Sequence, residues 1–275
     1  MSFTNLRLPA KPSAFFVFML ILGTFLLLQA KTVAEGMVET DVVISLNESS
    51  LKTEQQTTVR TPSVVELFTS EGCSSCPPAD KLLALAQKEF KEDAIVLSYH
   101  VDYWDRLGWK DPFSKRVYTE RQRQYAQHFN LKSIYTPQAV VNGITEFVGS
   151  NKSALWNAIS SFESAGHRSI EMEASHINDQ QLTIKYSYSA LKSTENIVLE
   201  LVLKAATIQV KHGENGGSTL SHINIVHDIF QTKESKGIAT FNLTVNFVKE
   251  NYLVVAFVQD KNTYAITGAK RVAIM

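Results

Sequence analysis

Residues 64–78 read VVELFTSEGCSSCPP, and this stretch decides how the rest of the chain is interpreted. Its apolar first part, Val64–Phe68, predicts a short β-strand. The two prolines that end it suit the first turn of a helix, where a missing backbone N–H group costs little. Cys73 and Cys76 are the only cysteines of the chain, and they stand between these two elements. The sequence therefore predicts one C-x-x-C motif at a strand-to-helix junction.

This junction is a favourable place for a reactive thiol. Unpaired N–H groups and the positive end of the helix dipole both stabilise a thiolate. We therefore predict that Cys73 is the nucleophile, and that Cys76, one helical turn further on, resolves a mixed disulfide formed on Cys73. The same motif also fits a static structural disulfide or half of a metal site.

Residues 62–165 alternate short apolar runs with helical patterns. They predict the order β-α-β-α-β-β-α, which is typical of a three-layer α/β domain. After the first strand we expect a helix over 77–90, a strand over 95–101, a helix that begins at Asp111-Pro112 and runs to Phe129, strands over 139–141 and 144–148 around an Asn142-Gly143 hairpin turn, and a helix over 155–162. Four basic side chains of the middle helix are interpreted as a solvated face: Lys115, Arg116, Arg121 and Arg123.

Residues 168–275 have a period of two instead. Apolar side chains alternate with polar ones from Leu182 to Tyr188 and again from Phe241 to Phe247. Together with the apolar runs at 170–174, 197–203, 208–210 and 253–258 and the C-terminal run, they predict about eight strands and a β-sandwich. We expect one domain over 62–166 and an all-β sandwich-like domain over 167–275.

The first 34 residues are typical of an export signal. Arg7 and Lys11 precede an uncharged apolar run, Ala14–Leu28, which is short for a bilayer span but suits a signal peptide. The alternative is an uncleaved signal anchor, which would be the only membrane contact of the chain. Residues 35–61 are polar and predict a linker. We therefore expect an exported protein, in the periplasm or outside the cell, where disulfides persist.

A second motif lies about sixty residues after the cysteines, where Ile134-Tyr135-Thr136-Pro137 leads into an apolar strand. With the C-x-x-C, this motif resembles the thioredoxin superfamily. The resemblance implies a thioredoxin-like α/β domain, followed here by the sandwich-like one. It also implies that Pro137 is cis and lies beside Cys73, and that Thr136 offers backbone hydrogen bonds to an extended substrate. The alternative is an ordinary trans proline at the start of a strand.

Four further stretches carry a closer resemblance: ELFTSEGCSSCPPAD, HVDYWDRLGWKDPFS, YTPQAVVNG and the later GENGG with VAFVQD. They are similar to a bacterial secreted family called domain of unknown function 1223, over about residues 62–270. This resemblance implies a thioredoxin-like domain with an appended β-domain and supplies no activity. Unlike familiar thioredoxins, the chain has no tryptophan before Cys73, and Ser74-Ser75 replaces a Gly-Pro pair.

Glu66 lies on the strand that leads to the cysteines, where burial would raise its pKa and make it a proton acceptor for Cys76. Thioredoxins carry a buried acid on that strand, but here the spacing to the first cysteine is one residue longer. A one-residue offset reverses the face of a strand unless a bulge intervenes.

Polar and aromatic residues gather after the second expected strand, including His100, Asp102 and Trp104. They predict either a wall or lid around the thiols or a loop packed by its own tryptophans. His100 with the two cysteines would also suit copper or zinc. Three later histidines beside a Gly-rich turn are interpreted as solvated loop residues: His212, His222 and His227.

The composition limits the class of partner. The chain has 27 basic and 27 acidic residues, so no net positive field favours nucleic acid. The leading hypothesis is a thiol–disulfide oxidoreductase that acts on protein or peptide thiols and disulfides and needs no cofactor. The alternatives are a binding or assembly protein with a structural disulfide, and metal handling through the cysteines.

Overall fold

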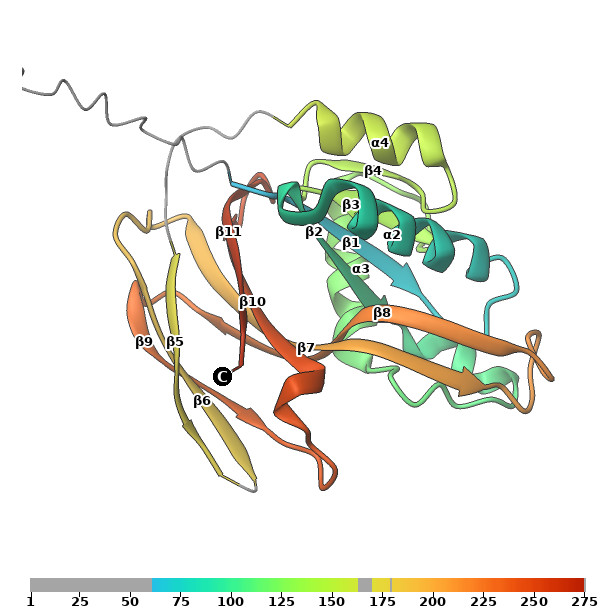
Figure 1. Ribbon diagram of the computed structural model, residues 1–275. Helices are drawn as coiled ribbons and strands as arrows, with labels where there is room; N and C mark the ends of the chain where they lie inside the picture. The colour runs from blue at the N-terminus through green and yellow to red at the C-terminus, as the bar shows by residue number, and fades with distance from the viewer. Residues whose placement is uncertain (1–60, 163–169, 179, 275) are drawn as a thin grey trace, which may run out of the picture. The chain divides into compact units, whose positions relative to one another are not determined.

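The structure, a computed structural model, describes residues 61–162, 170–178 and 180–274 (Figure 1). Its helices are α2 (Pro77–Phe90), α3 (Arg116–His128) and α4 (Lys152–Ser160). Its strands are β1 (Ser63–Thr69), β2 (Ala94–His100), β3 (Gln138–Val141), β4 (Thr145–Val148), β5 (Ile170–Ile177), β6 (Gln181–Tyr188), β7 (Glu195–Gln209), β8 (Thr219–Thr232), β9 (Lys236–Asn242), β10 (Tyr252–Asp260) and β11 (Ile266–Ala273). Short 3₁₀ turns cover Lys91–Asp93, Asp102–Leu107 and Lys249–Asn251.

The strands form an eight-stranded mixed sheet of order β11-β10-β7-β8-β2-β1-β3-β4 and a three-stranded sheet of order β5-β6-β9. β1 runs parallel to β2 and antiparallel to β3. β8 joins the two parts of the large sheet, because it pairs with β7 along its length and with β2 at Ser98 and Ile225. The Ser98 hydroxyl strengthens this junction by donating to the Ile223 carbonyl over 2.9 Å.

The expected fold class, a thioredoxin-like α/β domain followed by an all-β sandwich-like domain, is therefore wrong. One large sheet runs through both regions of the sequence, and the described residues contain few helices. The three-stranded sheet faces the β7 and β10 part of that same large sheet instead of pairing with a second sheet of its own. The expected boundary at residues 166 and 167 lies in a segment outside the described residues.

Different layers cover the two faces of β1. Val65 and Leu67 pack against Leu83 of α2 and Leu155 of α4. The alternate residues face the other way, where Phe68 contacts Tyr125 of α3. This alternation decides which side chains of β1 can reach the C-x-x-C helix, because successive residues of a strand point to opposite faces.

β7 is buried on both of its faces. Val198 and Val202 belong to the core under α3, while Leu199 and Leu201 face the three-stranded sheet. Strands buried on both faces have near-continuous apolar sequences, and the run Ile197–Leu203 is interrupted only by Glu200. The bulge where the β7–β8 register shifts, between Leu201 and Val202, adds local twist.

The order of elements predicted for 62–165 is confirmed, but some bounds differ. α3 begins at Arg116 and not at Asp111-Pro112: Asp111 Oδ1 accepts the Phe113 N–H over 2.9 Å and caps only a turn, because the backbone is extended at Lys115. The expected strand at 208–210 is the end of β7, and the alternating run from Phe241 to Phe247 leaves the sheet after Asn242. The expected signal segment and most of the linker lie outside the described residues. In the described part of the chain, no helix is long and apolar enough to cross a membrane.

The Asn142-Gly143 turn is confirmed as the link between β3 and β4. Both residues have positive φ, 51° and 73°, as a tight hairpin turn of this kind requires. Gly143 is also enclosed, because a Cβ atom there would lie 1.9 Å from the Tyr264 carbonyl oxygen. The turn therefore holds the loop before β11 against the edge of the sheet.

We predict that Gly143→Ala lowers the free energy of unfolding by about 2–4 kcal/mol, since both the backbone strain and the clash must be relieved. Gly217→Ala is the matched control, because Gly217 has a φ of 84° but open space around its Cβ position. Gly217→Ala should lower the free energy of unfolding by only about 1 kcal/mol. Urea unfolding of both variants measures the difference, and equal losses would contradict the role given to Tyr264.

Candidate functional site

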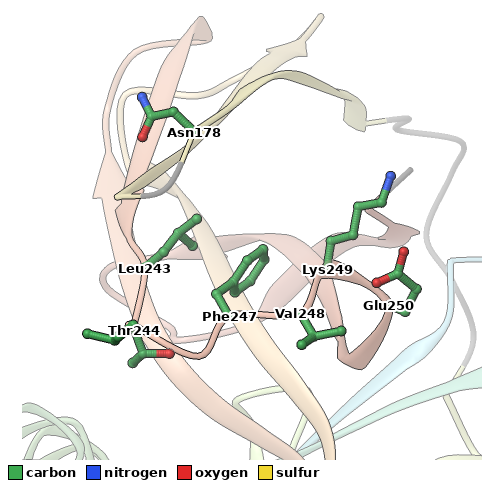
Figure 2. Close-up of a pocket in the computed structure, with 8 residues that line it drawn as sticks. Asn178, Leu243, Thr244, Phe247, Val248, Lys249 and Glu250 are labelled. Carbon is green, nitrogen blue, oxygen red and sulfur yellow. The ribbon is translucent and has the colours of Figure 1, made fainter.

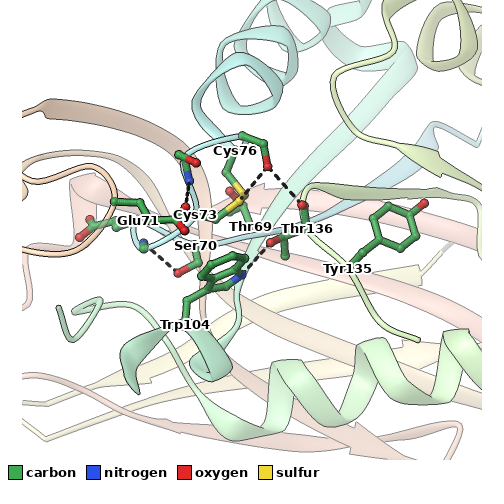
Figure 3. The surroundings of a disulfide bond; sticks show 12 residues. Thr69, Ser70, Glu71, Cys73, Cys76, Trp104, Tyr135 and Thr136 are labelled. Atoms are coloured by element: carbon green, nitrogen blue, oxygen red, sulfur yellow. Dashed lines mark hydrogen bonds between the residues drawn. A yellow bond between two sulfur atoms is a disulfide. The ribbon is translucent and has the colours of Figure 1, made fainter. Parts of the chain in front are cut away.

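The two cysteines form a disulfide at the N-terminus of α2 (Figure 3). Their Cα atoms are 5.4 Å apart. Cys76 is the N-cap residue, and its carbonyl accepts the N–H groups of Ala79 and Asp80 over 2.8 and 3.2 Å. Both cysteines are fully buried, whereas Ser74 and Ser75 between them are exposed. Only the middle of the motif therefore reaches the surface.

The Thr136–Pro137 peptide bond is cis, as the resemblance implied. Ser75 connects this segment to the disulfide: its hydroxyl donates to the Thr136 carbonyl over 3.4 Å and lies 3.3 Å from Cys73 Sγ. Trp104 Nε1 donates to Thr136 Oγ1 over 2.8 Å. Figure 3 shows the indole beside the disulfide loop. The structure thus brings Cys73, Cys76, Thr136 and Trp104 together.

Trp104 covers the loop at close range. A Cβ atom on Gly72 would lie 2.9 Å from the Trp104 Cβ atom, so the backbone before Cys73 passes directly against this side chain. The sequence allows the segment after β2 to be either a wall around the thiols or a loop packed by its own tryptophans. The contact of Trp104 with the disulfide loop favours the wall. Asp102 belongs to a different contact, because its carboxylate accepts the Thr119 hydroxyl of α3 over 2.6 Å.

The loop between β7 and β8, residues 210–218, forms a second cover, which we call the hairpin tip. Asn215 Nδ2 donates to the carbonyls of Glu71 and Cys73 over 2.8 and 2.9 Å. The carboxylate of Glu214 accepts the N–H group of Ser74 over 3.0 Å. The sequence indicates a Gly-rich turn here, and its GENGG stretch is one of those that carry the family resemblance, but it predicts no contact with the cysteines. Nothing local in the sequence indicates that it reaches residues 71–74.

His222 of β8 lies between two carboxylates and is only 2% exposed, so its interpretation as a solvated loop residue is wrong. Its Nε2 lies 3.6 Å from Glu71 Oε1, and its Nδ1 lies 3.6 Å from Asp80 Oδ2. Burial opposes a charge on this imidazole, but the two carboxylates outweigh burial and raise its pKa to about 9. His222 is therefore a buried cation at neutral pH.

His100 and Asp111 extend this group. His100 Nδ1 lies 2.7 Å from Asp111 Oδ2, which also accepts the backbone N–H of Glu71 over 2.9 Å. The rings of His100 and His222 meet edge to face with centroids 4.7 Å apart. Although burial opposes ionisation of Asp111, His100 and the backbone donors hold the pKa of its carboxyl below the usual value. We call Glu71, Asp80, His100, Asp111 and His222 the buried charge cluster.

Several atoms of this cluster have no hydrogen-bond partner among the described residues: Glu71 Oε1, Asp80 Oδ1, His100 Nε2 and both nitrogens of His222. Trp109 Nε1 donates to the other oxygen of Glu71 over 2.7 Å, and Thr69 donates to Asp80 over 3.3 Å. In the described part of the chain, no group of three or more His, Cys, Asp and Glu side chains is arranged to hold a metal ion.

Glu66 lies on the opposite face of β1 from α2. Arg121 Nε donates to its Oε1 over 2.6 Å, and the Tyr125 hydroxyl donates to its Oε2. The one-residue offset noted in the sequence has its expected effect, since Thr69 and not Glu66 faces Asp80 on α2. The structure does not bring Glu66 to the cysteines. Only 12% of the Arg121 side chain is exposed, so its interpretation as part of a solvated helix face is wrong.

We predict that Arg121→Ala lowers the free energy of unfolding by about 3–5 kcal/mol, because it leaves the buried Glu66 carboxylate without its cation. Arg123→Ala, two residues further along the same helix, removes an exposed side chain and should change stability by less than about 0.5 kcal/mol. Denaturant unfolding of both variants tests this. Similar values for the two would show that the Glu66 pair is dispensable.

Two pockets lie in contrasting surroundings. One of about 340 Å³ adjoins the disulfide site, between Pro77, Asp80 and Lys81 of α2 and Asn215 and Ser218–Ser221 of the hairpin. Figure 2 shows a pocket of about 500 Å³ lined by Asn178 and by residues 243–250, apart from Asn246. Among the described residues that line this second pocket there is no cysteine or histidine.

The comparisons with known proteins agree with the extent of this fold. A family described as "Protein of unknown function (DUF1223)" matches residues 64–259. A crystal structure of a protein from Agrobacterium tumefaciens is similar to the chain, with 28% identity and a TM-score of 0.59, over 78% of this chain and 94% of that one. A domain of the outer membrane lipoprotein Omp28 from Porphyromonas gingivalis is similar at 19% identity, with a TM-score of only 0.23, over 39% of this chain and 87% of that one. No curated protein matches.

Proposed function

The chain belongs to the DUF1223 family of proteins of unknown function, and we propose that it is an exported thiol–disulfide oxidoreductase acting on protein or peptide thiols. One observation carries the proposal: a C-x-x-C disulfide caps the N-terminus of α2, with the cis Thr136–Pro137 segment linked to it through Ser75. A helix N-terminus favours the thiolate that exchange requires.

The exchange step needs only a substrate dithiol. A substrate thiolate attacks Cys73 Sγ, the Cys73–Cys76 bond breaks, and Cys76 leaves as a thiolate that then takes up a proton. A second substrate thiolate then attacks the mixed disulfide at the substrate sulfur. This releases Cys73 and leaves the substrate oxidised and the cysteine pair reduced. The reverse sequence reduces a substrate disulfide.

The surroundings supply a place for the substrate chain. Ser74 and Ser75 are the exposed residues of the motif, and Thr136, one residue before the cis bond, is half-buried beside them. In the proposal, the backbone of Thr136 hydrogen-bonds an extended substrate segment. The cysteines themselves are buried, so attack on Cys73 requires that the loop open locally at Trp104 or at the hairpin tip.

Export is part of the proposal. The apolar run Ala14–Leu28 after two basic residues supports a secretory signal within residues 1–34. A disulfide is also more readily maintained in the periplasm or outside the cell than in a reducing cytosol.

A second candidate is a binding or assembly protein in which the disulfide is structural. The complete burial of both cysteines favours it, as do the two hydrogen bonds from Asn215 that hold the loop. In this case the disulfide would stabilise the loop and have no part in exchange.

Trapping of mixed disulfides tests the two candidates. In the reduced Cys76→Ser variant, Cys73 should form a mixed disulfide with a disulfide-containing peptide that persists, because no resolving thiol remains. Cys73→Ser is the matched control and should accumulate about tenfold less adduct, since the proposal assigns attack to Cys73, whose Sγ lies 3.3 Å from the hydroxyl of the exposed Ser75. Mass spectrometry after acid quenching measures both.

The absence of adduct from Cys76→Ser, together with loss of stability in both variants, would reject exchange and support the structural disulfide. Equal adduct on both variants would reject the assignment of Cys73 as nucleophile.

A further inference from the structure

We propose that His222 is a positioning residue for the thiols: its cation, held between Glu71 and Asp80, stabilises the thiolate formed when the Cys73–Cys76 disulfide is reduced. This inference rests on the proposed exchange function and adds to it the group that controls thiol ionisation. His222 comes from β8, far from the motif in sequence, and the geometry of three elements brings it there.

The first connection between His222 and the cysteines runs through α2. Asp80 follows Cys76 by four residues, and Cys76 has helical backbone angles of −78° and −38°. Residues four apart lie on the same helix face with Cβ atoms about 5–6 Å apart. Asp80 is 6% exposed, so its carboxylate lies within the protein on the side of the helix that carries Cys76. Its Oδ2 is 3.6 Å from His222 Nδ1.

The second connection between His222 and the cysteines runs through the loop before Cys73. Glu71 is two residues from Cys73, and the Asn215 side chain binds the carbonyls of both, which fixes their backbones relative to each other. The Glu71 carboxylate turns inward to His222 and Trp109. Each of the two carboxylates that bind His222 therefore comes from a residue close to one of the two cysteines.

Other titratable groups face His222 from the elements packed against it. β2 contributes His100, which is bound to Asp111 of the following loop. β7 places Ala206 opposite His222 in the strand register. Lys81 of α2 is exposed at the rim of the pocket that Asp80 lines. Among these groups, His222 is the buried cation that the two carboxylates share.

The consequence for the thiols follows from charge. When a thiol ionises it releases one proton to water and leaves a negative sulfur beside two carboxylates, which oppose it. The His222 cation offsets this repulsion at low local dielectric, where charges act over longer distances than in water. Because the carboxylates hold the pKa of His222 at about 9 against burial, the cation is present below that pH and is lost as the pH rises through it.

The pH dependence of alkylation of the reduced protein tests the inference. Iodoacetamide reacts with the thiolate, so its rate gives the apparent pKa of each cysteine when peptides are read by mass spectrometry. His222→Gln should raise the thiol pKa by about one unit or more, and Asp80→Asn should lower it. His212→Gln is the matched control, because His212 is an exposed histidine of the hairpin tip, and it should leave the profile unchanged.

Thiol pKa shifts of opposite sign in the two variants would indicate an electrostatic effect, since loss of packing alone would shift the thiol pKa in the same direction in both. A shift of the same sign in both, or no shift, would overturn the inference. If exchange fails while the opposite shifts in thiol pKa persist, the proposed function is wrong and the electrostatic role of His222 is supported. If exchange proceeds without these pKa shifts, only the role given to His222 is wrong.

A measurement on the unaltered protein covers the case in which His222→Gln does not fold. Coupling is reciprocal, so a thiolate stabilised by His222 must raise the pKa of His222 in turn. NMR titration of the imidazole should therefore give a higher pKa in the reduced protein than in the oxidised one. The same value in both states would contradict the proposal.

Discussion

The parallel pairing of β8 with β2 is the contact on which the rest of the structure depends. At Ser98 and Ile225 it merges the strands before and after α4 into one sheet. It also directs the β7–β8 hairpin along α2, so that His222 lies beneath the disulfide loop and Asn215 binds over it. Without this contact, the C-x-x-C motif would have neither its buried cation nor its cover.

The elements with strong local signals could be predicted from the sequence. The proline-capped α2, the Asn142-Gly143 hairpin and the order of elements up to α4 all follow from periodicity and turn chemistry. β8 could not be predicted in the same way. The register with β7 shifts at His227, which has no partner between Val226 and Asp228, so the period of two that reveals strands such as β6 is interrupted there.

The error in fold class also arises because the sequence pattern of a strand does not show which sheet the strand joins. The apolar runs of β7 and β10 suggest strands of a separate sandwich, but near-continuous apolar strands also occur in the middle of a large sheet covered on both faces. Of the site, the cysteines, Thr136 and Trp104 were found because local motifs mark them. Glu71, Asp80 and His222 form a cluster only through tertiary contacts, which no spacing in the sequence reveals.

We propose above all that the disulfide at the N-terminus of α2 is redox-active. Its equilibrium potential tests this most directly, with the protein held in glutathione buffers and the thiols alkylated and counted by mass spectrometry. We predict a potential within the range of exchange proteins, about −120 to −270 mV. A potential below about −300 mV would show that the bond resists reduction, as structural disulfides do, and would contradict the claim.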